Sequence, residues 1–330
     1  MHSSLIAWIM RAIPFGTIIM YGALGETVTE KSGNLNLGVP GIMYLGGFAG
    51  FASAWAYENS AANPNGFVSI LIALSCAILA SMAGGLIYAF LTISLRANQN
   101  VTGLALTTFG MGVANFFGVF ILNGASYSAA PIANKAFSAK IPVLSGLGDI
   151  GQVVFSYGFL VYAAILLAVV LHWFLTRTRA GLNLRAVGEN PATADAAGIN
   201  VTLYKYLSTC IGAGICGIGG LFGVLDYNQG IWATTGQIEA LGWLAVALVI
   251  FTTWKPLNAI WGAYLFGMLY WLYQFLPSLL GITMASHITD LVQMLPYVVT
   301  IIVLIVVSMR KKKENQPPAH LGLAYFREER

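Results

Sequence analysis

The chain has 330 residues, of which 58% are hydrophobic and only 8% are charged, and its mean hydropathy is +0.76. Because a soluble domain carries about three times that charged fraction, the composition leaves no room for a soluble domain. The net charge of +4 does not indicate a nucleic-acid partner, since a surface that follows phosphates requires a soluble basic face.

Long intervals without Asp, Glu, Lys or Arg recur along the chain, such as 59–95 and 256–289. A helix needs about 20 apolar residues to cross the hydrocarbon core. The sequence therefore predicts an all-α, polytopic transmembrane helical bundle. Residues 3–12 are expected to lie flat at the interface, because Arg11 is unfavourable in the bilayer core and Pro14 marks a break. About eight or nine spans are expected, at 13–31, 36–57, 67–95, 99–122, 152–176, 203–225, 240–254, 257–276 and 288–309.

Residues 25–41 form the first dense polar segment. Ionisable side chains at membrane depth are costly and are candidates for function by default. Glu26 and Glu30 share a helix face, and we expect both to lie at the interface, with Ser32 or Asn34 capping the next helix. The Gly and Pro residues predict a broken start to the second span, and broken helices line cavities in transporters. The alternative role is to line a substrate path, for which the candidates here are Glu26, Glu30, Asn34 and Asn36.

Small residues recur on the faces of two predicted spans. The stretch from Gly212 to Gly217 matches the dinucleotide fingerprint GxGxxG, but no strand precedes it and its surroundings indicate a membrane helix. Small residues on one helix face allow two backbones to approach closely. Close helix packing is therefore predicted for Gly46, Gly50, Gly212, Gly219 and Gly223.

Two amide side chains lie within apolar runs, at Asn115 and Gln274. An amide in hydrocarbon usually bonds to a neighbouring helix, which favours a packing role. The alternative is that these residues line the substrate path.

Residues 177–202 form a polar island between two apolar runs and contain a short helix. Asn190 is expected to cap its start, and Pro191 suits the first helical position because the missing N–H has no partner there. Gly198 is expected to end the helix in the left-handed conformation. A helix of about two turns is marginal alone in water, so its place between spans suggests a surface for a partner.

The basic residues indicate orientation. Residues 310–313 directly follow the last predicted span, and further Arg and Lys residues lie in 177–205. The positive-inside rule places both segments, and therefore the C-terminus, in the cytoplasm. With a cytoplasmic C-terminus, nine spans would place the N-terminus outside the cell and eight would place it in the cytoplasm, so its side is left open. Residues 32–38 resemble residues 235–242. This similarity is expected for an inverted repeat, and the alternative is a chance match between two short stretches.

The sequence contains no recognised motif for ATP binding, metal binding or catalysis. It contains neither GxxxxGK[ST] nor HExxH, its histidines are scattered, and its three cysteines lie in apolar runs. No metal site, catalytic residue or bound cofactor is therefore expected. A carrier driven by ion gradients would be expected to place ionisable residues at mid-membrane, and the long apolar runs are almost devoid of them.

Two stretches carry a resemblance to a known family. Residues 30–43, Glu-Lys-Ser-Gly-Asn-Leu-Asn-Leu-Gly-Val-Pro-Gly-Ile-Met, resemble a motif of ABC-importer permeases of the branched-chain amino acid, ribose and nucleoside superfamily. Residues 185–199 resemble the cytoplasmic coupling segment of the same family. The Gly-Glu-Asn-Pro stretch favours the nucleoside and simple-sugar branch. Pro40 departs from that branch, whose members often carry Glu at this place.

The resemblance implies a single permease domain over 1–330, with a coupling segment at 177–202 and a basic tail at 310–330, in the plasma membrane. The implied partners are a cytoplasmic ATPase that binds ATP, a second identical or related permease, an external solute-binding protein and the lipid bilayer. The expected solute is a nucleoside. Simple sugars, riboflavin and branched-chain amino acids are alternatives, and a stand-alone secondary transporter is the alternative from another class. The residues expected to contact the ATPase are Arg185, Glu189, Asn190, Pro191, Ala194, Asp195 and Gly198.

Overall fold

The computed structural model describes residues 2–121, 128–140, 148–232, 237–281, 286–310 and 316–327. These residues are mostly helical, with π-helical turns at Phe90–Ser94 (η1) and Gly223–Tyr227 (η3). The α-helices are α1 His2–Glu30, α2 Val39–Ser60, α3 Gly66–Ala89, α4 Gln99–Ile121, α5 Pro131–Phe137, α6 Gly148–Phe155, α7 Phe159–Arg177, α8 Arg179–Glu189, α9 Pro191–Ala196, α10 Val201–Phe222, α11 Gln237–Phe251, α12 Pro256–Leu280, α13 Ser286–Gln293 and α14 Leu295–Arg310.

Five of the described helical segments are long and apolar enough to cross a membrane. The helices α2 and α12 have 22 and 25 residues, and α11 is a shorter apolar helix of 15 residues. The predicted all-α, polytopic membrane fold is confirmed. The five segments are Ser4–Glu30, Gly66–Ser94, Gln99–Ile121, Phe159–Arg177 and Val201–Tyr227.

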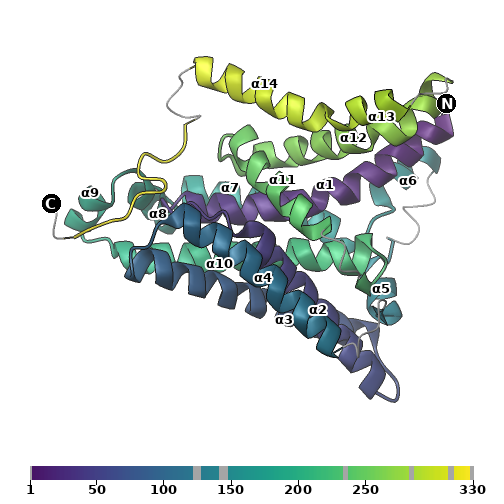
Figure 1. The fold of residues 1–330 in the computed structure, drawn as a ribbon, viewed down its shortest axis with the longest axis horizontal. Coiled ribbons are helices and arrows are strands. Elements are labelled where there is room, and N and C mark those ends of the chain that lie inside the picture. The colour runs from purple at the N-terminus through teal and green to yellow at the C-terminus, as the bar shows by residue number, and fades with distance from the viewer. Residues whose placement is uncertain are drawn as a thin grey trace.

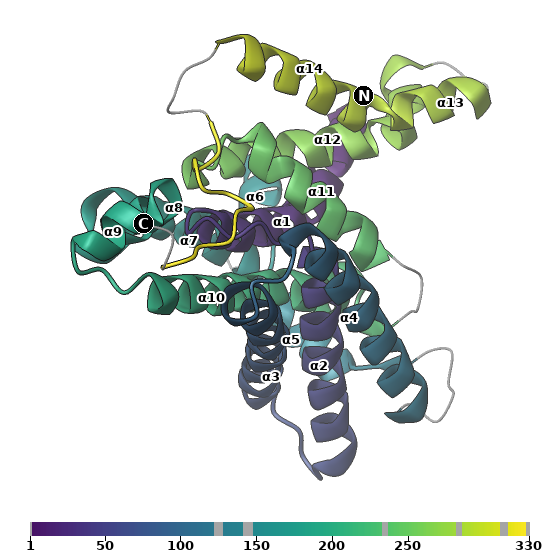
Figure 2. The ribbon, with the colours of Figure 1, turned by 60° about the vertical axis from the view of Figure 1, so that its left-hand side comes forward.

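The helices α1 and α10 form the centre of the bundle. They pack against each other, α1 also contacts α11 and α12, and α10 also contacts α2 and α3. In both views α2, α3 and α4 lie on one side of α1, whereas α12 and α14 lie on the other (Figures 1 and 2). The largest fully buried side chains include Tyr21, Phe51 and Phe222, so the core lies where these helices meet.

The two ends of the bundle differ. At one end α8 and α9 lie beside residues 316–327, which we call the tail, and we name this region the polar end (Figure 1). At the opposite end lie α5 and α6, and α5 directly follows β1 Ser128–Ala129, which forms a short antiparallel pair with β2 Ile231–Trp232. In this pair Ser128 lies opposite Trp232, and Ala129 lies opposite Ile231.

The N-terminal prediction is wrong. Residues 3–12 do not form a separate interfacial segment, because α1 runs without interruption through Pro14. The Arg11 guanidinium lies over the Trp271 ring at 4.6 Å, and this cation–π contact gives the charge a partner at the side of the bundle.

Two predicted spans are broken. The segment expected at 152–176 divides into α6 and α7 around Gly158, where any side chain would overlap the Phe137 carbonyl. The segment expected at 288–309 divides at Met294 into α13 and α14. Pro296 lies in the first turn of α14 and lacks the N–H that would continue the hydrogen bonds of α13.

The repeat-like stretches adopt different conformations where they are described. Residues 32–38 contain no helix, whereas residues 237–242 begin α11. Thr235 and Gly236 lie outside the described residues. The inverted repeat stays a prediction.

Candidate functional site

Residues 31–38 connect α1 to α2 through a buried, non-helical segment. Its backbone groups bond to side chains of other helices, as a chain inside a membrane protein requires. The Leu35 N–H donates to Gln99 Oε1 at 2.7 Å, and the Leu37 carbonyl accepts from the Thr107 hydroxyl at 3.0 Å. The Leu35 carbonyl accepts from the Tyr88 hydroxyl. The broken start to the second span is confirmed, but these three side-chain partners, Gln99, Thr107 and Tyr88, could not be identified from the sequence.

The depth of Glu26 and Glu30 in the membrane stays a prediction, but their surroundings within the protein are defined. Both are buried in the protein, at 1% and 2% exposure. Glu26 Oε1 accepts from the Asn36 N–H at 2.9 Å, and Glu30 Oε2 accepts from the indole N–H of Trp254. The two carboxyls therefore fix the connection to α2 and the end of α11.

The prediction that Ser32 or Asn34 caps α2 is wrong. The helix begins at Val39 with Gly38 as its N-cap, and neither Ser32 nor Asn34 caps it. Instead Asn36 Oδ1 accepts from the Gly38 N–H at 2.9 Å. Asn34 reaches α10, where its Nδ2 donates to the Thr209 hydroxyl at 3.1 Å, and its Oδ1 is buried without a partner in the described part of the chain.

The short helix predicted around Pro191 is confirmed as α9. Asn190 Oδ1 accepts from the Thr193 N–H at 3.0 Å, Pro191 lies in the first turn, and Gly198 has a φ of +83°. The preceding helix α8 was not predicted, and Thr178 caps it by accepting from the Gly181 N–H at 3.0 Å.

The two faces of α9 have different surroundings. Pro191 and Ala194 point inward, and Ala194 packs in a small cluster with Val187 and Val201. Ala194 is therefore a support for the helix rather than a contact surface. The solvent-accessible side is formed by Thr193, Ala196, Ala197 and Gly198, with Arg185, Glu189 and Asn190 exposed beside it.

The tail binds α8 and α9 back to the bundle. Asp195 Oδ2 accepts from the Tyr325 hydroxyl at 3.0 Å and pairs with Arg327 Nε at 3.2 Å. The Ala319 N–H approaches Glu189 Oε2 at 3.4 Å, and the Leu323 carbonyl accepts from Gln99 Nε2 at 3.3 Å. The tail thus connects α9 with the start of α4.

Three segments of backbone cross where α8 ends. The His320 N–H donates to the Gly188 carbonyl at 3.0 Å, and the Gly322 N–H donates to the Gly33 carbonyl at 3.2 Å. A side chain on Gly188 would overlap the Lys31 carbonyl, so glycine is required by close approach. Burial lowers the pKa of Lys31 to about 8, and the nearby Arg185 charge acts in the same direction.

Four of the five glycines predicted to pack helices closely have no room for a side chain. A methyl group on Gly46 would lie 2.5 Å from the Gly217 Cα, for example. Gly223 differs, because a methyl group there would meet Ile18 at an ordinary 3.6 Å. The four tight glycines, which join α1, α2, α3 and α10, are Gly46, Gly50, Gly212 and Gly219.

The two amides expected at mid-membrane, Asn115 and Gln274, have different environments. Gln274 is exposed on α12, whereas Asn115 is half-buried on α4 with its Oδ1 inaccessible and without a partner among the described residues. Gly118, one turn after Asn115, approaches Trp232, since a methyl group on it would lie 3.0 Å from Trp232 Nε1. The indole N–H of Trp232 is likewise buried and has no partner in the described chain.

Aromatic rings surround Trp232. Its ring centroid lies 5.7 Å from that of Tyr44, 5.1 Å from Phe48 and 6.0 Å from Phe51, all on α2. We call Trp232, Tyr44, Phe48 and Phe51 the aromatic cluster. All four rings are buried in the core, where the indole N–H of Trp232 is a polar group without a partner among the described residues. The cluster was not predicted, because β2 and α2 are distant in the sequence.

Comparison with known proteins identifies relatives over most of the chain. The family described as "Branched-chain amino acid transport system / permease component" matches residues 8–304. The putative glucose ABC transporter permease protein TsgC13 of Haloferax volcanii is 35% identical over 77% of this chain and 72% of its own length.

The names of two further relatives state that they transport guanosine or nucleosides. The guanosine ABC transporter permease protein NupQ of Bacillus subtilis is 34% identical over 74% of this chain and 75% of its own length. The nucleoside ABC transporter permease protein NupC of Lactococcus lactis is 31% identical, covering 88% of both chains.

Proposed function

Since the chain belongs to the family of branched-chain amino acid transport system permease components and is an ABC-importer permease, we propose that it carries a nucleoside and that a separate ATPase drives it. The similarity to NupQ and NupC carries this proposal. The similarity to TsgC13 makes a simple sugar the second candidate.

The polar end is proposed to be cytoplasmic. Most Lys and Arg residues of the described part of the chain lie in segments that meet at this end, whereas Arg11 lies near the start of α1 and Lys135 and Lys140 lie in or just after α5, the helix at the opposite end. An excess of Lys and Arg marks cytoplasmic loops in multi-pass proteins. The basic residues of the polar end are Lys31, Arg96, Arg177, Arg179, Arg185, Lys205, Lys255 and Arg327.

The ATPase would dock on the exposed side of α9. Thr193, Ala196 and Ala197 are small, so a partner can approach this face closely, while Arg185 and Glu189 offer charges at its edge. The ATPase would bind ATP, and its closure around the nucleotide would move the docked helix α9. A second permease, identical or related, would complete the path, and an external solute-binding protein would deliver the solute at the opposite end.

The aromatic cluster is the proposed contact for the solute in this chain. The four rings are buried in this structure, so contact with a solute requires this region to open during transport. Once open, aromatic rings can stack on a nucleobase, and the unbonded Trp232 N–H and Asn115 Oδ1 offer one donor and one acceptor. A base has both a flat face and polar edges, so it uses both features, whereas a sugar would use mainly the polar atoms.

Uptake into vesicles tests the substrate and the energy source separately. The permease is reconstituted with its ATPase and binding protein, and uptake of labelled guanosine and glucose is compared with and without ATP. We expect ATP-dependent guanosine uptake. Uptake of glucose alone would overturn the nucleoside assignment. Uptake that persists without the ATPase would overturn the proposal that ATP hydrolysis by a separate subunit powers transport.

A further inference from the structure

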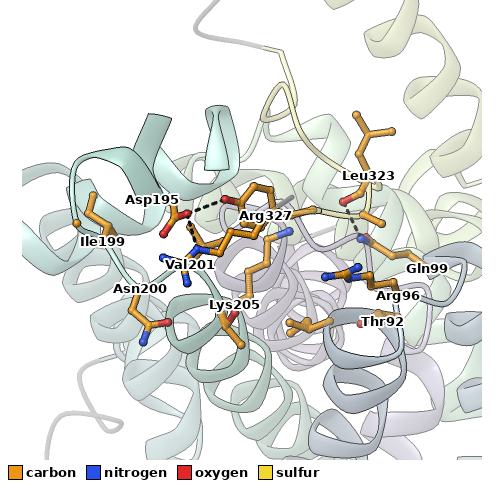
Figure 3. Close-up of a pocket in the computed structure, with 15 residues that line it drawn as sticks. Thr92, Arg96, Gln99, Asp195, Ile199, Asn200, Val201, Lys205, Leu323 and Arg327 are labelled. Atoms are coloured by element: carbon orange, nitrogen blue, oxygen red, sulfur yellow. Dashed lines mark hydrogen bonds and ion pairs between the residues drawn. The ribbon is translucent and has the colours of Figure 1, made fainter. Parts of the chain in front are cut away.

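A cavity of about 530 Å³ opens at the polar end between the tail, η1 and the first turn of α10. Figure 3 shows side chains from these elements turned toward it. Three of the lining residues are cationic and one is acidic, so the cavity has an excess of positive charge. The residues that matter for its chemistry are Arg96, Gln99, Asp195, Thr202, Lys205 and Arg327.

Lys205 is the central feature of this cavity. It rises from α10 between Asp195 on one side and Arg96 and Gln99 on the other (Figure 3). The residue is only 3% exposed, and it lines the cavity with no charged or hydrogen-bonding partner for its ammonium group among the described residues. A buried charge is costly unless it is paired, so this arrangement is suited to an anion that enters from outside.

The start of α10 adds donors to the same cavity. Val201 and Thr202 line it, and they are the first two residues of this 22-residue helix. Asn200 bonds the Leu203 N–H at 3.0 Å, so the capping side chain does not occupy the two preceding amides. Early N–H groups of a helix have no intrahelical acceptor, and the helix dipole there favours an anion.

The remaining charges are arranged around Lys205. The Arg96 guanidinium stacks on the Phe326 ring at 4.5 Å, which leaves its N–H edge available for other partners. Arg96 adopts a left-handed backbone with a φ of +58°, a costly conformation outside glycine. Asp195, the carboxylate of the cavity, already accepts from Tyr325 and pairs with Arg327.

We propose that this cavity binds a phosphate group, either as a free anion or as the head of a membrane lipid. Arginine, lysine and a helix N-terminus together match the charge and the several oxygens of a phosphate. The apolar side chains of Leu95, Leu203 and Leu207 are exposed beside these elements, so a lipid phosphate can approach from the bilayer. The site is additional to the transport path and lies next to α9.

The test measures binding by the full chain in nanodiscs. In one arm inorganic phosphate is titrated into protein in phosphatidylcholine discs and followed by calorimetry. In the other arm the discs contain phosphatidic acid, and native mass spectrometry counts the lipid retained by the protein. We expect saturable binding of one phosphate group per chain, weakened about tenfold or more by Lys205→Met and by Arg96→Gln.

Two variants serve as references. Lys205→Arg keeps the charge and should retain binding, and Arg179→Gln removes an exposed cation that does not line the cavity. Binding in the first arm identifies a free anion, and retention in the second arm alone identifies a lipid. No saturable binding of either probe, or an equal loss in Arg179→Gln, overturns the proposal. If Lys205→Met does not fold, Arg96→Gln decides, and the proposed transport function is unaffected by either result.

Discussion

Glu26 and Glu30 are buried in α1; Glu30 interacts electrostatically with Lys31, whereas Glu26 has no cationic partner among the described residues. Their bonding partners are neutral N–H donors on residues that join α1 to α2 and end α11. At position 26 the fold therefore requires a hydrogen-bond acceptor more than a negative charge.

Replacing Glu26 tests that distinction. Glu26→Gln keeps an acceptor for the Asn36 N–H, so we expect thermal stability close to that of the parent chain. Glu26→Leu leaves a buried N–H unbonded and should cost about 1–3 kcal/mol. The midpoint of thermal unfolding in detergent measures both. Equal destabilisation by the two variants would show that the charge itself is required.

Trp232 offers a second substitution at the residue scale. Trp232→Phe keeps a ring against Tyr44, Phe48 and Phe51 but removes the indole donor. If this donor bonds to the solute, we expect the KM for guanosine uptake to rise about tenfold with little change in unfolding temperature. Phe48→Leu, which removes a ring and no polar group, is the matched comparison. An unchanged KM in Trp232→Phe would remove this indole from the path.

Among the elements, α9 shows what local sequence determines. Asn190, Pro191 and Gly198 define its ends through contacts within a few residues, and this part was predictable. Which side of α9 faces outward depends on Val187, Val201 and the tail, and Tyr325 is 130 residues from Asp195. A pattern read along the chain does not reveal such distant contacts, and for the same reason the hydrogen bond from Trp254 to Glu30 was missed.

A matched pair of substitutions separates docking from stability in α9. Ala196 is exposed, so Ala196→Glu should block ATPase assembly and leave the unfolding temperature unchanged. Ala194 is 3% exposed, so Ala194→Leu should overpack its cluster and cost about 1–3 kcal/mol. Co-purification of the ATPase and thermal unfolding distinguish the two effects. Normal assembly and uptake with Ala196→Glu would contradict docking on this face.

The tail joins elements that are far apart in the sequence. It contacts Gly33 between α1 and α2, Gln99 at the start of α4, and Asp195 on α9. The sequence predicted a basic tail but not its docking, because the partners of Tyr325 and His320 lie in other parts of the chain.

Docking of the tail should weaken in acid. Burial lowers the pKa of His320, and the charge of Lys205 lowers it further. A released His320 takes up a proton below its ordinary value of about 6.5, whereas the docked residue resists protonation. Docking is therefore strongest above that pH and declines as the pH falls toward the lowered pKa.

Protease sensitivity of the tail at pH 7.5 and pH 5.5 measures this change, and we expect faster cleavage at the lower pH. His320→Gln cannot take up the proton and should show the same sensitivity at both values. A tail equally protected at both pH values in the parent chain would contradict the assignment.

The crossing of Lys31, Gly33 and Gly188 has a mechanical consequence. Main-chain atoms meet there without intervening side chains, so the junction has no rotamers that could absorb a displacement. We expect a push on α9 to shift residues 31–33 by a similar amount, and with them the end of α1 that holds Glu30. This junction would therefore transmit a displacement of α9 to the end of α1, where Glu26 and Glu30 are buried.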